Sequence, residues 1–196
     1  MRELRMKNFK AKAARQGGFT LVELMIVVVI VAIVLTIAVP GFRDVLLRNR
    51  MAGKLNELVA AMQMARSEAI KNNMNAVFCK STNGTSCNGI ATDSWSEGWL
   101  VWLNTDGDTN VDADEIVGSG GSTDDFAFVG DGDGTTTDIH SLARIEFRAD
   151  GAAIVGGVPG SGTLKLCIDQ QLAGLISLDL TGRPVARKLP SAAGCP

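Results

Sequence analysis

The chain has 196 residues, 46% of them hydrophobic, which suffices for one globular domain and an N-terminal extension. Its net charge is −2, but residues 1–18 carry six basic side chains against one acid (+5), so residues 19–196 sum to −7. This acidic body argues against wholesale binding to nucleic acid, which needs a basic surface. A zinc site is not expected either, because the four cysteines include no Cys-x-x-Cys pair and there is one histidine.

The N-terminal segment differs from an ordinary secretory signal. In such a signal the apolar core precedes the cleavage site, whereas here the basic residues end at Gly17-Gly18 and the apolar core follows. Cleavage after Gly18 would release residues 1–18 as a basic leader. The apolar segment would then stay in the mature chain as an anchor.

The apolar segment runs from Phe19 to Val39 and is predicted to span a membrane. Its only charge is Glu23, and its other polar residues are two threonines. As a helix it would be about 31 Å long, matching a bilayer core of about 30 Å, and a strand of this length would be rare. The basic flank predicts that the leader stays in the cytoplasm and that the C-terminal body lies outside.

Glu23 is unusual because a carboxylate in an apolar span costs about 2–3 kcal/mol or more unless it is paired. One interpretation is that Glu23 is solvated at the membrane interface. The other is that cleavage creates an ammonium group on Phe19, which pairs with Glu23 of a neighbouring chain in apolar surroundings. We favour the second interpretation, since burial makes an unpaired charge costly.

Residues 18–25 read GFTLVELM, which resembles the prepilin peptidase site of type IV pilins and type II secretion pseudopilins. The resemblance implies cleavage between Gly18 and Phe19, N-methylation of Phe19, and contact of Glu23 with a neighbouring subunit's N-terminus. Pro40 resembles the helix-breaking proline of these proteins. It implies a kink or a melted stretch there, because proline removes one backbone donor; the alternative is that the membrane helix simply ends at this point.

Residues 41–73 are predicted to form an amphipathic helix that ends at the Asn72-Asn73 pair. Its charged residues, Lys54 and Glu57 among them, are expected mainly on other faces than the apolar stripe, which should pack on a sheet. The stripe recurs at steps of three and four residues and consists of Met51, Leu55, Leu58, Met62, Ala65 and Ala69.

Several short motifs in and after this helix resemble the GspH/FimT group of minor pilins. They are RNR at 48–50, NEL at 56–58, ARSEAI at 65–70 and WSEGWLV at 95–101. The resemblance implies an α+β fold in which a long N-terminal helix packs on an antiparallel β-sheet or β-sandwich domain. Residues 19–40 would be the membrane and assembly half of the helix, 41–73 its amphipathic half, and 74–196 a β-rich periplasmic domain.

The β-rich region is predicted from short apolar runs separated by turn residues. Two polar stretches, Gly118–Thr123 and Gly130–Thr137, are expected to be loops. The expected strands are Ala76–Cys79, Trp99–Leu103, Phe126–Val129, Arg144–Arg148, Leu164–Ile168 and Leu175–Leu180.

An even number of cysteines behind an export segment suggests disulfides formed in an oxidising compartment. Pairing of nearest neighbours in sequence gives Cys79–Cys87 and Cys167–Cys195. The sequence alone leaves the other two connectivities open.

Asp106, Asp108, Asn110 and Asp112 alternate with other residues, as the oxygen ligands of a calcium loop do. Valines stand where such a loop needs its glycine and its bidentate glutamate. We therefore expect an acidic turn without metal, and calcium is the alternative. No nucleophile motif or P-loop is present, and His140 has no nameable partner, so we expect neither an enzyme nor a cofactor.

A small basic patch near the C-terminus contains Gly182-Arg183, Arg187 and Lys188. It is similar to the Gly-Arg-x-Arg motif with which FimT-like proteins of transformable bacteria bind DNA, except that the second arginine is displaced toward the C-terminus. We favour a turn and a last strand with solvated charges, and DNA binding is the alternative.

These observations together predict a minor type IV pilin that is incorporated into the pilus and helps to prime filament assembly. Its expected partners are other minor and major pilins, the prepilin peptidase and the inner-membrane assembly machinery. It would begin as a single-pass protein of the bacterial inner membrane and end in the pilus. The alternatives are a type II secretion pseudopilin and a DNA-binding minor pilin for natural transformation.

Overall fold

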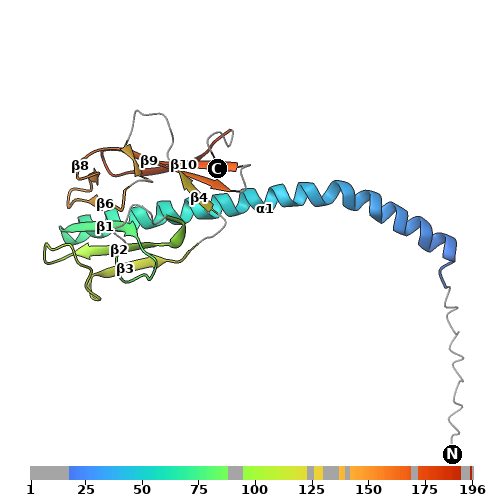
Figure 1. Cartoon of the computed structure of the whole chain (residues 1–196), viewed down its shortest axis with the longest axis horizontal. Helices are drawn as coiled ribbons and strands as arrows, with labels where there is room; N and C mark the ends of the chain where they lie inside the picture. The colour runs from blue at the N-terminus through green and yellow to red at the C-terminus, as the bar shows by residue number, and fades with distance from the viewer. Residues whose placement is uncertain are drawn as a thin grey trace, which may run out of the picture. The chain divides into compact units, whose positions relative to one another are not determined.

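The computed structural model describes residues 18–87, 95–122, 126–129, 137–139, 142–168, 172–190 and 195 (Figure 1). The chain divides into two compact units, one extending to Arg43 and one covering Asp44–Pro196. The first long element is helix α1 (Leu21–Asn72). It is followed by β1 (Asn75–Lys80), the 3₁₀ helix η1 (Trp95–Glu97), β2 (Trp99–Asn104), β3 (Ile116–Gly120), β4 (Phe126–Val129), β5 (Thr137–Asp138), β6 (Arg144–Phe147), β7 (Ala153–Val155), β8 (Val158–Pro159), β9 (Gly162–Ile168), β10 (Leu172–Leu178) and β11 (Pro184–Lys188).

Helix α1 ends where the asparagine pair predicts. Asn73 adopts a left-handed conformation with φ of 52°. The Asn73 N–H donates to the Ile70 carbonyl, and the Met74 N–H donates to the Ala69 carbonyl at 3.1 Å. These two bonds form a Schellman motif, which satisfies carbonyls that the helix end would otherwise leave unpaired.

The backbone of α1 is helical at every residue from Leu21 to Asn72, position 40 included. The expectation of a melted stretch at Pro40 is therefore wrong, and so is the alternative that the helix ends there. One proline removes one backbone hydrogen bond, and the bonds on either side continue the helix. A kink at Pro40 stays a prediction.

The strands of the second unit form two sheets that are antiparallel except for one short pair. The larger sheet has the order β3-β2-β1-β6-β7-β8, and the other has the order β11-β10-β9-β4 with β5 parallel to β9. The register pairs Phe78 with Val101 in the first sheet and Ile176 with Leu164 in the second. The predicted α+β fold, with a long helix on antiparallel sheets, is confirmed.

The core lies between the second half of α1 and the two sheets. Every residue of the predicted apolar stripe is at most 3% exposed, and these side chains share one buried cluster with Phe78, Val101 and Ile176. Gly174 on β10 permits this packing, because a Cβ atom there would lie 2.7 Å from Leu55 Cδ1. The 3.6-residue period thus correctly gives the face that α1 buries.

Two expectations about the second unit need correction. The stretch from Gly118 was expected to be a loop, but its first residues belong to β3, where Gly120 pairs with Trp99. A side chain at Gly120 would overlap the Trp99 indole, so glycine here serves close packing and not a turn. Lys54 was expected on another face than the apolar stripe but is only 3% exposed. Residues 130–136 of the second expected loop lie outside the described part of the chain.

Candidate functional site

The N-terminal end of α1 is closed by a reciprocal pair of hydrogen bonds. The Glu23 N–H donates to the Thr20 hydroxyl at 3.2 Å, and the Thr20 N–H donates to Glu23 Oε2 at 3.4 Å. This is a capping box, in which a threonine and a glutamate three residues later satisfy each other's backbone N–H groups. Glu23 therefore has a local role at the helix start, which the sequence analysis did not assign to it.

The expected cleavage site lies immediately before this cap. Gly18 is exposed with no atom near the position of a Cβ, and Phe19 is 83% exposed. The bond between Gly18 and Phe19 is thus accessible from solvent in this chain. Residues 1–17 of the expected leader lie outside the described residues.

The helix after the cap presents apolar side chains in all directions. Its large hydrophobic side chains between Leu21 and Val39 are 47–75% exposed, and none of its most apolar 18-residue window is buried within the chain. By length and composition this helix is able to cross a membrane. The Thr36 hydroxyl donates to the Ile33 carbonyl at 2.7 Å, so this polar group is satisfied within the helix.

The basic residues predicted near the C-terminus lie in and after the turn between β10 and β11. The Gly182 N–H donates to the Asp179 carbonyl, and Gly182 has φ of 75°. The Asp179 carboxylate accepts from the Thr181 hydroxyl at 2.6 Å and from the Arg183 N–H at 2.9 Å. These two hydrogen bonds, that from Thr181 first, lower the pKa of Asp179.

The structure brings Arg183 and Arg187 to one surface. Both line the same shallow hollow beside Leu175 and Ser177 of β10. Residues two or four apart on a strand share a face, so displacement of the second arginine along β11 keeps it on the side of Arg183. Lys188 does not line this hollow, so the predicted set of three cations separates into a pair and a single residue.

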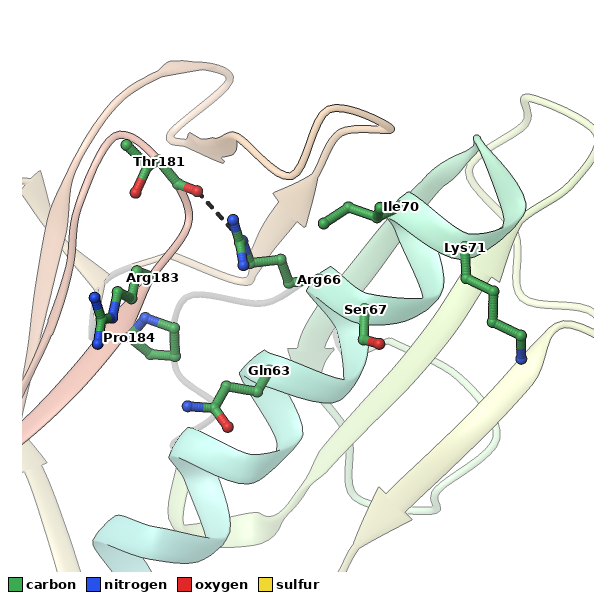
Figure 2. A pocket seen from close by; sticks show the side chains of 8 residues that line it. All are labelled: Gln63, Arg66, Ser67, Ile70, Lys71, Thr181, Arg183 and Pro184. Carbon is green, nitrogen blue, oxygen red and sulfur yellow. Dashed lines mark hydrogen bonds between the residues drawn. The ribbon is translucent and has the colours of Figure 1, made fainter.

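A larger groove of about 720 Å³ lies between α1 and the same turn (Figure 2). Arg66 of α1 points into it and donates through Nε to the Gly151 carbonyl at 3.1 Å and to the Thr181 carbonyl at 3.3 Å. The groove is lined by Gln63, Arg66, Ser67, Ile70, Lys71, Thr181, Arg183 and Pro184. This site could not be recognised from the sequence, because its lining residues extend from Gln63 to Pro184, 121 positions later in the chain.

The proposed calcium residues lie in a turn that satisfies its own polar groups. Asp106 Oδ1 accepts from the Asp108 N–H at 3.0 Å, and Asp108 Oδ1 accepts from the Asn110 N–H at 2.7 Å. Asp106 and Asp108 thus form Asx-type turns, and within the described segments no group of three or more acidic, histidine or cysteine side chains is placed to hold a metal ion. His140 lies outside the described residues.

Glu115 anchors this acidic turn from within. It is 3% exposed, and its carboxylate accepts from the Thr105 N–H and hydroxyl, both at 2.7 Å, and from the Asp112 N–H at 3.3 Å. Burial alone would raise the pKa of Glu115, but these hydrogen bonds outweigh burial and lower it.

The four cysteines form two disulfides. Cys79 is joined to Cys87 and Cys167 to Cys195, with Cα–Cα distances of 5.6 and 5.7 Å. Cys79 belongs to a small apolar cluster with Val77, Leu100 and Trp102, and Cys87 packs against this cluster. There the Trp102 indole donates to Cys87 Sγ at 3.2 Å.

Known proteins resemble this chain in sequence and in fold. A family model described as "Type II transport protein GspH" matches residues 54–182, and one described as "Prokaryotic N-terminal methylation motif" matches residues 13–39. A fimbrial protein of Pseudomonas aeruginosa is 44% identical over 55 residues, which are 28% of this chain. The match spans about a third of that relative's length, 35%.

Two crystal structures of the type IV minor pilin FimU from Pseudomonas aeruginosa have the same fold. Their TM-scores are 0.53 and 0.51 at 16% sequence identity. The matches cover 74% and 72% of this chain and 96% and 98% of those chains. The chain therefore belongs to the GspH family, carries a prokaryotic N-terminal methylation motif, and has the fold of a type IV minor pilin.

Proposed function

We propose that this protein is a minor pilin that enters a type IV pilus through lateral packing of its N-terminal helix and helps to prime filament assembly. The observation that carries the proposal is the uncovered apolar surface of residues 21–39. Such a surface requires an apolar environment, which a bilayer supplies before assembly and neighbouring helices supply afterwards.

In this proposal the prepilin peptidase cleaves after Gly18, Phe19 is methylated, and the basic leader stays on the cytoplasmic side. The second unit then faces the periplasm, in agreement with its disulfides. Partners are other minor and major pilins and the inner-membrane assembly machinery. The methylation motif at residues 13–39 supports the processing step.

Glu23 would pair with the Phe19 ammonium of a neighbouring subunit. Its capping bond from the Thr20 N–H is long, at 3.4 Å, and uses one carboxylate oxygen. The remaining acceptor sites suit an ammonium group, and pairing removes the cost of an isolated charge in apolar surroundings. The Glu23 side chain therefore has two separable roles, one in the helix cap and one in the pairing between subunits.

Three variants separate the role of Glu23 in the cap from its role in the pairing. Glu23→Gln keeps both capping bonds but removes the charge, Thr20→Val removes the bond to the Thr20 hydroxyl but keeps the charge, and Glu23→Ala removes the charge together with the bond to the Glu23 carboxylate. We expect leader cleavage in all three, and incorporation into sheared pili to fail in both Glu23 variants and to persist in Thr20→Val. Normal incorporation of Glu23→Gln would rule out the pairing, and unchanged pili in a deletion strain would rule out the priming role.

The GspH family match favours a second candidate, a pseudopilin of a type II secretion system. This candidate predicts that exported proteins accumulate in the periplasm of a deletion strain while pili remain normal. Release of those proteins at the usual rate would rule it out.

The shared surface of Arg183 and Arg187 favours a third candidate, a DNA-binding minor pilin. The full chain in detergent should then retard double-stranded DNA at low salt, and Arg183→Ala/Arg187→Ala should abolish the shift. Arg144→Ala/Arg148→Ala is a matched control, since it removes two half-exposed arginines elsewhere. Equal binding by both double variants would mean that the hollow is not the DNA site.

A further inference from the structure

The groove between α1 and the β10–β11 turn concentrates positive charge in an acidic protein. Arg66, Lys71 and Arg183 line it, and among its described lining residues none is acidic. Figure 2 shows Lys71 and Arg183 toward its two ends, with Arg66 between them. We call this site the basic groove. Its cations are spread along the groove, which suits several separate anionic groups better than one small anion.

The basic groove is held in shape by the chain itself. The Arg66 hydrogen bonds tie α1 to the turns at Gly151 and Thr181, and Gly151 and Gly182 both have positive φ. A ligand would therefore find the groove largely formed. This reduces the conformational entropy lost on binding.

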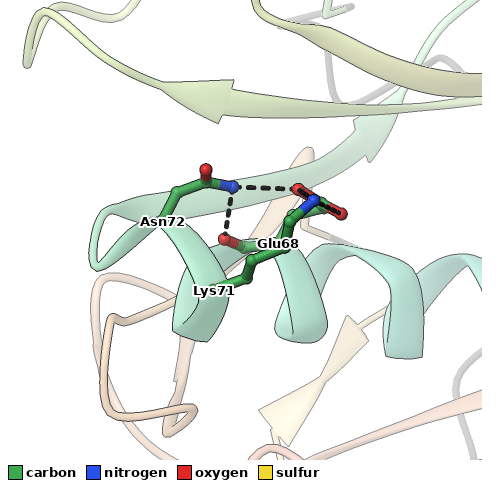
Figure 3. Close-up of polar contacts among 3 residues, drawn as sticks. All are labelled: Glu68, Lys71 and Asn72. Atoms are coloured by element: carbon green, nitrogen blue, oxygen red, sulfur yellow. Dashed lines mark hydrogen bonds and ion pairs between the residues drawn. The ribbon is translucent and has the colours of Figure 1, made fainter.

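The charges beside the groove leave its cations accessible. Lys71 lies 3.3 Å from Glu68, which also accepts from the Asn72 amide (Figure 3), but the Lys71 side chain is 70% exposed. An ammonium group has three donors, so this contact does not saturate it. Asp179 attracts Arg183 from the turn but does not line the basic groove.

A surface of opposite charge lies on another part of the second unit. The turn at residues 105–115, which we call the acidic turn, exposes four carboxylates on a framework of internal hydrogen bonds. These carboxylates are Asp106, Asp108, Asp112 and Asp114. Partial desolvation, and then repulsion from Glu115 and the other aspartates, raises the pKa of Asp112. A cationic partner would relieve this repulsion.

The two surfaces lie beside different sheets. The acidic turn joins β2 to β3, and β3 is an edge strand of the larger sheet. The basic groove adjoins β11, an edge strand of the other sheet, and in Figure 1 β2–β3 and β9–β10 lie on opposite sides of α1. Complementary patches at different places on one body make a heterologous contact, which repeats from copy to copy.

We infer that the basic groove binds the acidic turn of a second copy of this chain. Lys71 and Arg183 contact the aspartates, while the side chains of Gln63 and Ser67 offer further hydrogen bonds. The inference goes beyond the proposed function, since the contact requires neither pilus incorporation nor a particular secretion machinery. Because the charges on both sides are exposed, the contact should weaken steeply with salt.

The test uses the full chain in detergent with the photo-crosslinker p-benzoylphenylalanine in place of exposed Ser67. Illumination at about 0.05 M salt should give a dimer whose cross-link maps to residues 105–115, with a much lower yield at about 1 M. Lys71→Glu/Arg183→Glu should lower the yield about fivefold, and mixing with an Asp106→Lys/Asp108→Lys chain should restore it. Arg48→Glu/Arg144→Glu, with the same charge change at exposed arginines that do not line the groove, should leave the yield unchanged.

Several results would overturn the inference. They are the absence of a dimer and a cross-link confined to residues 21–43. A cross-linking yield that changes neither with salt nor in Lys71→Glu/Arg183→Glu would also contradict it. So would a failure of the Asp106→Lys/Asp108→Lys chain to restore the yield of Lys71→Glu/Arg183→Glu. In cells, capture of a different pilin at Ser67 with no copy of this chain would also overturn it. None of these results bears on pilus assembly in the deletion strain, so the two proposals fail independently.

Discussion

The Trp99 indole donates a hydrogen bond of 2.8 Å to Oε1 of Glu57, which precedes it by 42 residues. The same oxygen lies 2.9 Å from Nζ of Lys54, whose side chain is 3% exposed. Helix α1 and strand β2 are thus joined through one carboxylate, which also neutralises a buried cation. Neither Lys54 nor Trp99 has its polar atom left unpaired inside the domain.

Replacing Glu57 with Leu should therefore destabilise the second unit by more than the loss of one hydrogen bond. Lys54 would keep its buried charge without a counterion, at a cost of about 2–3 kcal/mol, less than for a fully buried pair because Glu57 is 40% exposed. Glu57→Gln also removes the counterion but should cost less, about 1–2 kcal/mol, because the amide oxygen can still accept from both Trp99 and Lys54. Denaturant unfolding of the full chain in detergent measures both.

A matched control is Asp44→Leu, which breaks the exposed ion pair with Arg48 and should cost less than about 1 kcal/mol. The double variant Lys54→Met/Glu57→Leu should recover most of the loss, because it removes the cation together with its partner. Equal losses for Glu57→Leu and Asp44→Leu would show that the buried charge is not what Glu57 compensates.

Gly182→Ala tests the turn that presents Arg183. Gly182 has φ of 75°, and an added Cβ would overlap the Gly151 carbonyl oxygen. We expect a loss of more than about 2 kcal/mol in unfolding free energy, from the left-handed backbone and the steric overlap together. Gly107→Ala is the control, since φ there is 85° with no atom within 4 Å, and only the conformational cost of about 1 kcal/mol should be seen. Similar losses at both positions would mean that the Gly151 contact relaxes freely.

Glu115 should make stability depend on acid pH. Its folded-state pKa lies below its ordinary value of 4.5, so as the pH falls the unfolded chain takes up this proton first. The stabilisation is complete well above pH 4.5 and is lost as the pH falls from there through the folded-state pKa. Glu115→Gln should be less stable at pH 7 and should lose less stability between neutral and acid pH. An unchanged profile in Glu115→Gln would exclude Glu115 as its source.

The sequence could predict those features whose information is local. The buried face of α1 follows from a repeat of three and four residues, and the end of α1 follows from an asparagine that tolerates a left-handed backbone. The processing motif at Gly18-Phe19 was likewise recognisable from neighbouring residues. Side-chain alternation along a strand also accounts for why Arg183 and Arg187 share a surface.

Features that depend on contacts distant in sequence could not be predicted in this way. Arg66 has the pattern of a solvated helix residue, yet it bonds to Thr181, 115 residues later. Lys54 can be buried because the Glu57 carboxylate, which also accepts from Trp99, neutralises its charge. The spacing of residues along the helix does not predict this contact. Gly120 was expected in a loop. Its place in β3 depends on Trp99 of β2, whose indole occupies the space where a side chain at Gly120 would lie. Of these three positions, Arg66 also lines the basic groove.

The two disulfides should differ in what they contribute to stability. They close loops with sequence separations of 8 and 28, for which loop entropy gives about 2.6 and about 3.6 kcal/mol. Cys167→Ala/Cys195→Ala should therefore destabilise the chain by about 1 kcal/mol more than Cys79→Ala/Cys87→Ala if the entropy of the unfolded chain dominates. Alanine is the replacement in both pairs, because Cys79 and Cys167 are at most 2% exposed and a serine hydroxyl there would be buried. Cys79 and Cys87 also lie in an apolar cluster with Trp102. Denaturant midpoints of the two double variants decide the order; a larger loss on removing Cys79–Cys87 would show that packing around Trp102 outweighs loop length.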